Sequence, residues 1–536
     1  MKPRILLAGY FDMYVGQIAH IPVGEIGLLT DVAPGQIPRG ALIKANNISF
    51  ETGAITKAPG ARKYNAGQVL PASVVGLFDW WPNTATQRLI AACSNGSLYR
   101  DIGDMTFSGA TAINTGLGTL TPRCMFVEGG QEVANNEKKL FFISGQSQIK
   151  VLTGDNTTFE TIASPATDWT GSNFPTVGVI HQNRFWLFAG QQSYASDTAD
   201  HENFLTNYLT DPIYTGEGGN VIGAHVFKGR LFCFKEGGFV YYLDDSDFDS
   251  DNWVWRKLAS NFGLASPHGI VEVMNDMIAV NESGSPISYS GVESLGDIES
   301  ADLLRLLQIE DYYRHNSSLS GLEGLHSLYY EAKKQLFFTG RTTYRTTNNM
   351  LLHIDYNKDQ PRVALWNKDQ AECLALRKDI FKVQRPIYGS NDGYVYLMDQ
   401  EDRLTGSTAY TGQFKIGHTD FRWLDEKIAS KNKLFDYLAI EFVPQGTWNL
   451  SVDVYIDGNF SETISFAMDV RDDGLDTFTL DTDLLGREEA QTIQMPLHGS
   501  GRRISFDCYQ AGSNQNFHIT CLTVGFRVSA EQATRV

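Results

Sequence analysis

The chain has 536 residues, of which 42% are hydrophobic and 12% aromatic, so it can bury more than one core and does not have the composition of a disordered protein. Its formal net charge of -18 argues against a protein that grips nucleic acid by its phosphates, because such binding needs clustered Lys and Arg. No stretch approaches the roughly 18 apolar residues of a membrane span, and the N-terminus carries no convincing export signal.

The first predicted element is an extended N-terminal arm over residues 1–70. From Asp31 to Tyr64 the sequence DVAPGQIPRGALIKANNISFETGAITKAPGARKY places turn formers at short intervals between small apolar pieces. This pattern predicts an extended segment with one small hairpin rather than a compact domain.

A two-strand module then recurs from about residue 89 to residue 402, as in RLFCFKEGGFVYYL at Arg230 to Leu243. The first strands begin near Leu89, Leu140, Phe185, Leu231, Ile278, Leu336 and Ile387. Their spacing of roughly 45 to 60 residues matches one propeller blade. A hairpin that is apolar on both sides is marginal alone, and stacking the hairpins in a ring covers both faces. We therefore predict an all-β fold with a β-propeller of six or seven blades over 71–405; a long meander or two β-sandwiches is the alternative.

One helix is predicted inside this β-rich region, as an insert near residues 298–315. Asp297 or Ser300 is the candidate N-cap. One approximate apolar stripe is formed by Leu303, Leu306, Leu307 and Tyr313. Such a stripe suits a helix that lies on the side of the propeller and equally a subunit contact, so both interpretations stay open.

The last two predicted segments are a connector and a second domain. Residues 406–433 begin polar and Gly-rich, as a strand that leaves the ring would. Residues 434–536 alternate with period two and carry an Asp457-Gly458 hairpin signal. We predict an antiparallel β-sandwich there.

The sequence contains no complete motif for catalysis or cofactor binding, so neither an enzyme nor a cofactor is predicted. There is no G-x-S-x-G elbow, no H-E-x-x-H and no phosphate loop, and GLGTLT at Gly116 is only a fragment of a dinucleotide fingerprint. The six cysteines have no C-x-x-C spacing and are expected to be free, buried thiols.

The acidic run DDSDFDSDNW, from Asp244 to Trp253, is the one candidate metal loop. Its aspartates alternate as calcium ligands can, from Asp247 to Asp251. Asn252 replaces the glycine of an EF-hand loop and Leu258 replaces its bidentate Glu. A solvated loop is favoured over a calcium site, and no metal ligand is predicted.

The basic residues are short groups scattered along the sequence, and most are expected to be solvated strand ends. They are Lys138/Lys139, Lys333/Lys334, Lys427/Lys431/Lys433 and Arg502/Arg503. An acidic surface could nevertheless line a passage for DNA, because like charges prevent sticking.

Several segments together resemble one family. The arm pattern N-x-x-F...G-x-I-x-K-x-P-G, at Asn47 to Gly60, resembles the start of tail structural proteins of short-tailed bacteriophages. The segment HQNRFWLFAGQQSYASDTADHENF resembles their NRLWF...S...ASDPENF blade, and LLHIDYNKDQPRVALWN and PIYGSNDGYVYLMD resemble two further blades. The chain thus resembles the tail nozzle or hub proteins, the tail tubular protein B family, over about two-thirds of its length.

The resemblance implies a structural virion protein with no catalytic residue. It implies a homo-oligomeric ring, a hexamer in this family, below the portal and the head-to-tail adaptor. Such a ring extends the channel for double-stranded DNA, retains the packaged DNA, guides its ejection and contacts tail fibres or spikes. The location implied is the virion tail, assembled in the host cytoplasm. The insert around Ile298 to Tyr313 departs from the family pattern and leaves fibre attachment open.

Under this resemblance the arm is the best candidate for clasping a neighbouring subunit or the adaptor, by burying Ile43, Ile48 and Phe50. Deleting Met1 to Asp31 is then expected to leave a folded monomer and to weaken assembly.

The main alternative is a carbohydrate-binding, receptor-recognition propeller of a phage tail. Aromatic residues at blade tips, Trp80/Trp81 and Trp253/Trp255, could stack on sugars, although packing inside the blades is the favoured role. A cellular scaffold propeller is a third class.

Overall fold

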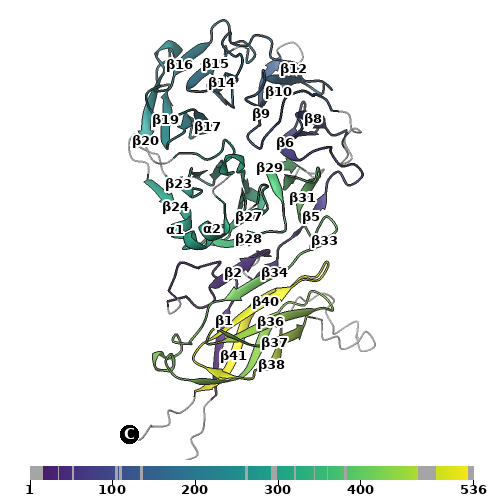
Figure 1. Cartoon of the computed structure of the whole chain (residues 1–536), viewed down its shortest axis with the longest axis vertical. Helices are drawn as coiled ribbons and strands as arrows, with labels where there is room; N and C mark the ends of the chain where they lie inside the picture. Colours follow the sequence, from purple (N-terminus) through teal and green to yellow (C-terminus); the bar gives the residue numbers. More distant parts are fainter. Residues whose placement is uncertain are drawn as a thin grey trace, which may run out of the picture. The chain divides into compact units, whose positions relative to one another are not determined.

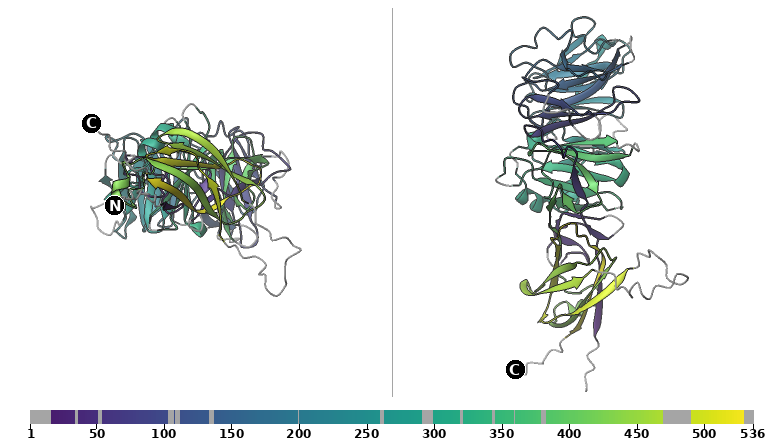
Figure 2. Two further views of the ribbon diagram at one scale, coloured as in Figure 1. Left: turned by 90° about the horizontal axis from the view of Figure 1, so that it is seen from below. Right: turned by 90° about the vertical axis from the view of Figure 1, so that its right-hand side faces the viewer.

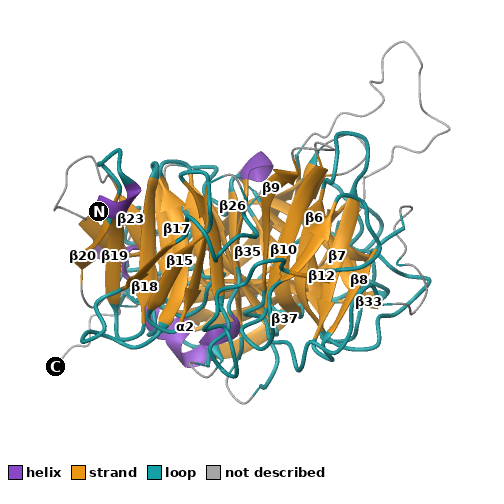
Figure 3. Ribbon diagram, turned by 90° about the horizontal axis from the view of Figure 1, so that it is seen from above, coloured by secondary structure: helices purple, strands orange, loops and turns teal. Residues whose placement is uncertain are grey.

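The computed structural model describes residues 16–528 except 34–35, 51–53, 103–106, 108–111, 133–136, 199, 260–262, 291–298, 319–320, 343–344, 359, 379–382 and 469–489. Strands dominate these residues, with only short helical turns between them (Figure 3). The chain divides into two compact units: unit 1 comprises Met1–Lys57 and Thr411–Val536, and unit 2 comprises Ala58–Tyr410. No helix among the described residues is long and apolar enough to cross a bilayer.

Unit 2 is a β-propeller whose described residues form seven sheets in chain order around a ring (Figure 1). The first sheet has three strands, β6 (Val74–Trp80), β7 (Arg88–Cys93) and β8 (Ser97–Arg100). The next two sheets contain β9 (Met125–Glu132), β10 (Glu137–Ile143), β11 (Lys150–Thr153) and β12 (Glu160–Thr161), then β13 (Val177–His181), β14 (Arg184–Ala189), β15 (Gln192–Ala195) and β16 (Leu209–Pro212).

The following three sheets again have four strands each. They contain β17 (Val221–Phe227), β18 (Arg230–Lys235), β19 (Phe239–Asp244) and β20 (Val254–Ala259); β21 (Ile270–Val273), β22 (Asp276–Val280), β23 (Pro286–Ser290) and β24 (Glu299–Asp302); and β25 (Ser327–Tyr330), β26 (Gln335–Gly340), β27 (Met350–Asp355) and β28 (Arg362–Trp366). The last contains β29 (Ala371–Lys378), β30 (Gln384–Ser390), β31 (Val395–Gln400) and β5 (Gly60–Lys63), extended by the short β32 (Leu404–Thr405) and β33 (Thr408–Ala409).

The first strand of each sheet lies nearest the ring centre, because consecutive first strands touch one another: β6 with β9, β9 with β13, β13 with β17, and β29 back to β6. The second strand of each sheet is covered on both faces. In β14, β26 and most of β18 every residue is buried, so these strands read as continuous apolar runs rather than alternating ones. The predicted β-propeller is therefore confirmed. Its described residues form seven sheets, the larger of the two predicted blade numbers.

The strand β5 closes the ring. It pairs antiparallel with β31, Tyr396 opposite Lys63 and Leu397 opposite Arg62, so the outermost strand of the last sheet comes from before the first. Gly60 allows this close approach, since a Cβ there would lie 2.4 Å from the carbonyl oxygen of Asp402. Hydrogen bonds thereby join the two ends of the ring instead of leaving a free edge.

Unit 1 is a sandwich of two antiparallel sheets. One contains β3 (Ile48–Ser49), β4 (Ile55–Lys57), β41 (His518–Val528), β35 (Lys433–Phe442) and β38 (Gln491–Pro496), with β1 (Gln17–Pro22) on β41 and β39 (Ser500–Gly501) on β35. The other contains β2 (Leu42–Asn46), β34 (Gly412–Ile416), β40 (Ile504–Gln510), β36 (Asn449–Ile456) and β37 (Asn459–Ala467). The purple β1 runs beside the yellow β41 (Figures 1 and 2). The predicted hairpin is present, with φ of 49° at Asp457 and 89° at Gly458, as the two central residues of a type I′ turn require.

The observed boundaries differ from the predicted ones. The arm of 1–70 is not a separate element, because β1 to β4 belong to the sandwich and β5 belongs to the propeller. The connector of 406–433 contributes β34 to the sandwich. These segments carry buried side chains, Ala19 and Ile21 among them, that complete sheets begun elsewhere in the sequence. Deleting Met1 to Asp31 removes strand β1, so a fully folded monomer is no longer the expected result.

The predicted insert is two short helices, α1 (Leu303–Leu306) and α2 (Glu310–Asn316), instead of one long helix. The N-cap is Asp302, whose Oδ1 accepts a hydrogen bond from the backbone N–H of Leu304 at 2.9 Å. Ser300 lies in β24, and Asp297 lies outside the described residues. Gln308 has a left-handed φ of 54°, which no α-helix contains, so the helix breaks there.

Candidate subunit-contact sites

The arm residues predicted to clasp a neighbour lie mostly inside unit 1. Ile48 in β3 and Phe50 after it are fully buried, with 0% of each side chain exposed, while Ile43 in β2 is half-buried. The hairpin of β3 and β4 folds onto β41 and covers them. In this conformation only Ile43 of the three presents surface to another molecule.

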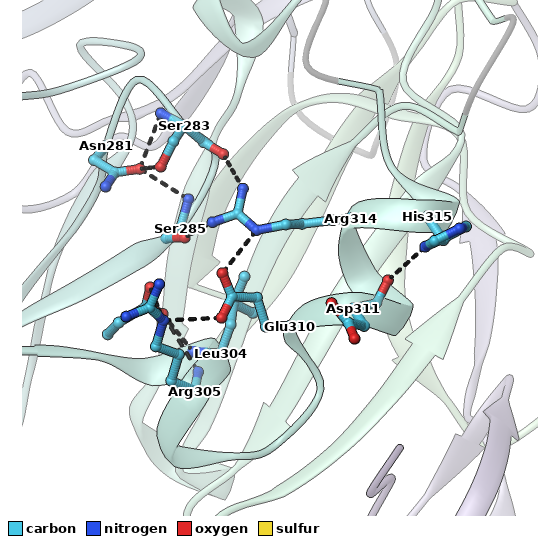
Figure 4. Close-up of polar contacts among 10 residues, drawn as sticks. Asn281, Ser283, Ser285, Leu304, Arg305, Glu310, Asp311, Arg314 and His315 are labelled. Carbon is cyan, nitrogen blue, oxygen red and sulfur yellow. Dashed lines mark hydrogen bonds and ion pairs between the residues drawn. The ribbon is translucent and has the colours of Figure 1, made fainter. Parts of the chain in front are cut away.

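The helical insert is held to the propeller by one arginine (Figure 4). Arg314 of α2 donates from Nη1 to the carbonyl oxygen of Ser283 at 2.9 Å and from Nη2 to Oγ of Ser285 at 2.9 Å. These two residues lie in the turn between β22 and β23, which Asn281 Oδ1 organises by accepting both of their backbone N–H groups. The insert therefore has a fixed position on the fifth sheet of the propeller, β21 to β24.

A single carboxylate links α1 to α2. Glu310 accepts from Arg305 Nε at 2.9 Å through Oε2 and from Arg314 Nε at 3.0 Å through Oε1 (Figure 4). The hydrogen bonds from Arg305 and Arg314 hold the pKa of Glu310 below its usual value. At neutral pH the ionised Glu310 therefore holds the two short helices together through hydrogen bonds to Arg305 and Arg314.

The predicted apolar stripe is divided between core and surface. Leu303 and Tyr313 are buried, Leu307 is half-buried, and Leu306 is 65% exposed beside the 72% exposed side chain of Arg305. The break at Gln308 rotates the second helix, so four positions that share one face of a long helix do not share one here. Leu306 is the member of the set that another subunit could cover.

The centre of the propeller contains a contact that the sequence did not suggest. His268 and His326, which precede β21 and β25, stack with ring centroids 4.1 Å apart. Their Nε2 atoms are each 2.8 Å from carbonyl oxygens of Cys124 and Pro122, which precede β9 on a non-neighbouring sheet. The contact thus crosses the ring. The ring centre is therefore bridged by these residues and does not form an open passage for a DNA duplex.

Burial keeps both imidazoles neutral. It lowers the pKa of His268 to about 4, and burial together with the neighbouring His268 lowers the pKa of His326 well below its usual value. No motif marks these residues in the sequence, because they occupy irregular positions just before strands in separate repeats.

The acidic loop from Asp244 to Asp251 has a structural explanation. Asp247 Oδ1 accepts the backbone N–H of Asp249 at 2.9 Å, and Asp249 Oδ1 accepts that of Asp251 at 3.1 Å. Alternating aspartates therefore form successive Asx turns. Among the described residues no group of three or more His, Cys, Asp or Glu side chains is placed to hold a metal ion.

The tryptophans proposed for sugar stacking are mainly packing residues. Trp80 and Trp255 are buried, and their indole N–H groups donate to the Gly154 carbonyl oxygen at 3.2 Å and to Ser193 Oγ at 3.1 Å. Trp253 stacks on Trp186. The six cysteines are free, and all but the half-buried Cys521 are buried, as expected.

The comparisons with known proteins add little to this geometry. No family model and no curated protein matches the sequence. Solved structures do match, among them one described as "YCF48 bound to D1 peptide", with 11% identity and a TM-score of 0.37 over 62% of this chain and 94% of the other.

Proposed function

We propose that the chain is a structural subunit of the tail nozzle or hub of a short-tailed bacteriophage. In this proposal copies of the chain form a homo-oligomeric ring, a hexamer by the family resemblance, below the portal and adaptor in the virion tail. The ring extends the DNA channel, retains the packaged DNA and guides its ejection. Tail fibres or spikes attach to it, assembly takes place in the host cytoplasm, and no catalytic step or cofactor is involved.

The observation that carries the proposal is the structural role of the arm motif, on which the resemblance rests. Asn47 donates from Nδ2 to the Thr411 carbonyl oxygen at 2.9 Å, and Phe50 is fully buried. Lys57 is also fully buried and donates from Nζ to Gly512 O at 3.1 Å. Gly60 starts the strand that closes the propeller. The motif positions Asn47, Phe50, Lys57 and Gly60 are thus each fixed by packing or hydrogen bonds, which suits a rigid framework of the subunit.

The crossed centre of the propeller supports the same proposal in a second way. Many propellers place a ligand site in the central funnel, and here residues before β9, β21 and β25 meet across it. Rigid propellers with filled centres suit walls of an assembly, whose lumen lies between subunits. The carbohydrate-binding alternative receives less support, because of the four tryptophans named for it Trp80 and Trp255 are buried and Trp81 and Trp253 are half-buried.

The experiment is electron microscopy of the purified full chain, alone and with the phage's adaptor. The expected result is rings with a central hole wide enough for a duplex. Leu306→Glu serves as the matched variant, because Leu306 is exposed and its substitution should leave the fold intact while weakening a contact through the insert. Monomers at every concentration, with and without the adaptor, would contradict the proposal.

A further inference from the structure

Unit 1 contains a groove with a volume of about 780 Å³ that is rich in arginine. His418, Arg422, Arg502 and Arg503 line it, and an adjoining hollow that shares His418 and Arg422 adds Arg39. We call this surface, defined by these five residues, the basic groove. Its members come from the N-terminal segment, from the stretch before β35 and from the turn between β39 and β40.

The turn that carries Arg502 and Arg503 is fixed by a carboxylate. Asp457 Oδ1 accepts the backbone N–H groups of Arg502 at 3.0 Å and Arg503 at 2.9 Å. The guanidinium groups of these two arginines have no hydrogen bond or ion pair with any described residue, and both residues are exposed. Asp457 thus binds the backbone of this turn and not the guanidinium groups. The side chains of Arg502 and Arg503 therefore remain available to a ligand.

A buried lysine adds positive charge behind the groove. Lys433 is fully buried, and its Nζ donates to the carbonyl oxygens of Arg502 at 2.8 Å and Lys431 at 3.0 Å. Burial lowers the pKa of Lys433 to about 8, although the carboxylates of Asp420 and Asp457 partly oppose this shift. An anion held nearby would favour the charged form of this lysine.

Two buried nitrogen atoms, one in the basic groove and one in its adjoining hollow, have no hydrogen-bond partner among the described residues. His418 Nδ1 and Trp423 Nε1 are inaccessible to solvent and make no hydrogen bond in the described structure. Buried polar atoms of folded proteins are nearly always hydrogen-bonded, so an unsatisfied indole N–H is unusual. Trp423 lines the hollow beside Arg39, whose guanidinium lies 5.9 Å from the centre of the Trp423 ring. An oxygen-bearing ligand or a water would supply the missing acceptor.

The excess of positive over negative side chains at the basic groove favours an anionic ligand. Arg39, Arg422, Arg502, Arg503 and the underlying Lys433 face two carboxylates, those of Asp420 and Asp457. Of these arginines Arg422 is already paired, with Nη2 2.7 Å from Asp420 Oδ2. The other three guanidinium groups, of Arg39, Arg502 and Arg503, are more than a ligand with a single carboxylate could engage. They suit a chain of oxyanions, since each guanidinium fork matches one phosphate.

We propose that the basic groove binds phosphate groups, and that the backbone of double-stranded DNA supplies them. The phosphate chemistry stands on the groove alone, whereas the choice of DNA rests on the proposed function. Because the whole chain has a net charge of -18, DNA is repelled elsewhere and contacts this groove only locally. Such a contact would hold the packaged DNA weakly enough for ejection.

The test measures binding of inorganic phosphate by calorimetry and of a labelled DNA duplex by fluorescence anisotropy, both to the full-length chain. With three unpaired arginines the logarithm of the duplex affinity should fall against the logarithm of salt concentration with a slope of about -2.7. The double variant Arg502→Ala/Arg503→Ala keeps the backbone N–H groups that Asp457 uses. It should lower the slope by about 2 and weaken binding at low salt roughly tenfold or more.

The matched control is Arg62→Ala/Arg345→Ala, which removes the same charge from two exposed arginines of unit 2 and should leave the salt slope unchanged. Unchanged melting temperatures show that both variants fold, and unchanged rings in electron micrographs show that they assemble. A failure of the DNA-binding proposal can therefore be distinguished from a failure of the proposed ring. Phosphate binding that depends on Arg502 and Arg503 without duplex binding would overturn the DNA source. Equal phosphate and duplex binding by the double variant and the wild type would overturn the site itself.

Discussion

Replacing Gly60 with alanine should destabilise the propeller selectively. A Cβ at Gly60 would lie 2.3 Å from Asp402 Oδ1, 2.4 Å from Asp402 O and 2.5 Å from Leu404 O. Two of these atoms belong to the backbone and cannot rotate away, so the closing strand β5 must shift from β31. Overpacking typically costs about 1 to 3 kcal/mol, and the upper end of about 3 kcal/mol applies where the backbone has to move. For a unit of about 350 residues the expected fall in melting temperature is about 4 °C, since the unfolding entropy grows with chain length.

The assay is differential scanning calorimetry of Gly60→Ala beside Gly67→Ala. Gly67 lies seven residues further along the same unit, is exposed, and has no atom within 4 Å of an added Cβ. Gly67→Ala should therefore be neutral or stabilising by about 0.4 to 1 kcal/mol. Equal melting temperatures for the two variants would refute the reasoning. That result would mean that residues 60–63 do not close the ring and that the segment is a free arm.

Three further predictions concern other parts of the chain. Lys57→Ala should destabilise unit 1 by about 1 to 3 kcal/mol in urea unfolding, because it removes a fully buried side chain and the donor that now bonds the half-buried Gly512 carbonyl; an unchanged midpoint would contradict this role. Because the folded-state pKa of His268 lies near 4 and that of His326 is shifted in the same direction, stability is complete above the unfolded pKa near 6.5 and falls as the pH drops through it. The His268 contribution amounts to at most about 2 kcal/mol between pH 7 and pH 5, and His268→Gln should show a smaller loss over this range in urea unfolding. Leu306→Glu should weaken self-association in sedimentation velocity without lowering the melting temperature, and an equal loss of stability would place Leu306 in the core instead.

The propeller was predictable because the same burial pattern recurs in the strands of each blade along the sequence. A strand in the middle of a sheet is covered by a neighbouring sheet on each face, so β14 and β18 read as apolar runs wherever they occur. The sandwich was predictable for the opposite reason, since strands such as β36 alternate buried and less buried residues. Both signals are local.

The arm and the insert were less predictable, because their partners are distant in the sequence. β1 pairs with β41, about 500 residues away, and the sequence of Gln17–Pro22 does not indicate which strand it pairs with. The helical stripe predicted one long helix, and a single left-handed residue, Gln308, divided it. The surface expected at Ile48 and Phe50 became core for the same reason, since the strands that cover them come from the other end of the chain.

By itself the sequence determined the class of fold, the repeat and the sandwich, because these follow from short-range alternation and from turn residues. The tertiary structure alone decided which charges act together. Arg502, Arg503 and Lys433 read as scattered strand ends, yet folding of unit 1 brings them to one groove with Arg39 and Arg422. Electrostatic interaction depends on distance in space rather than along the chain, so a protein with a net charge of -18 can still carry a local site for an anion.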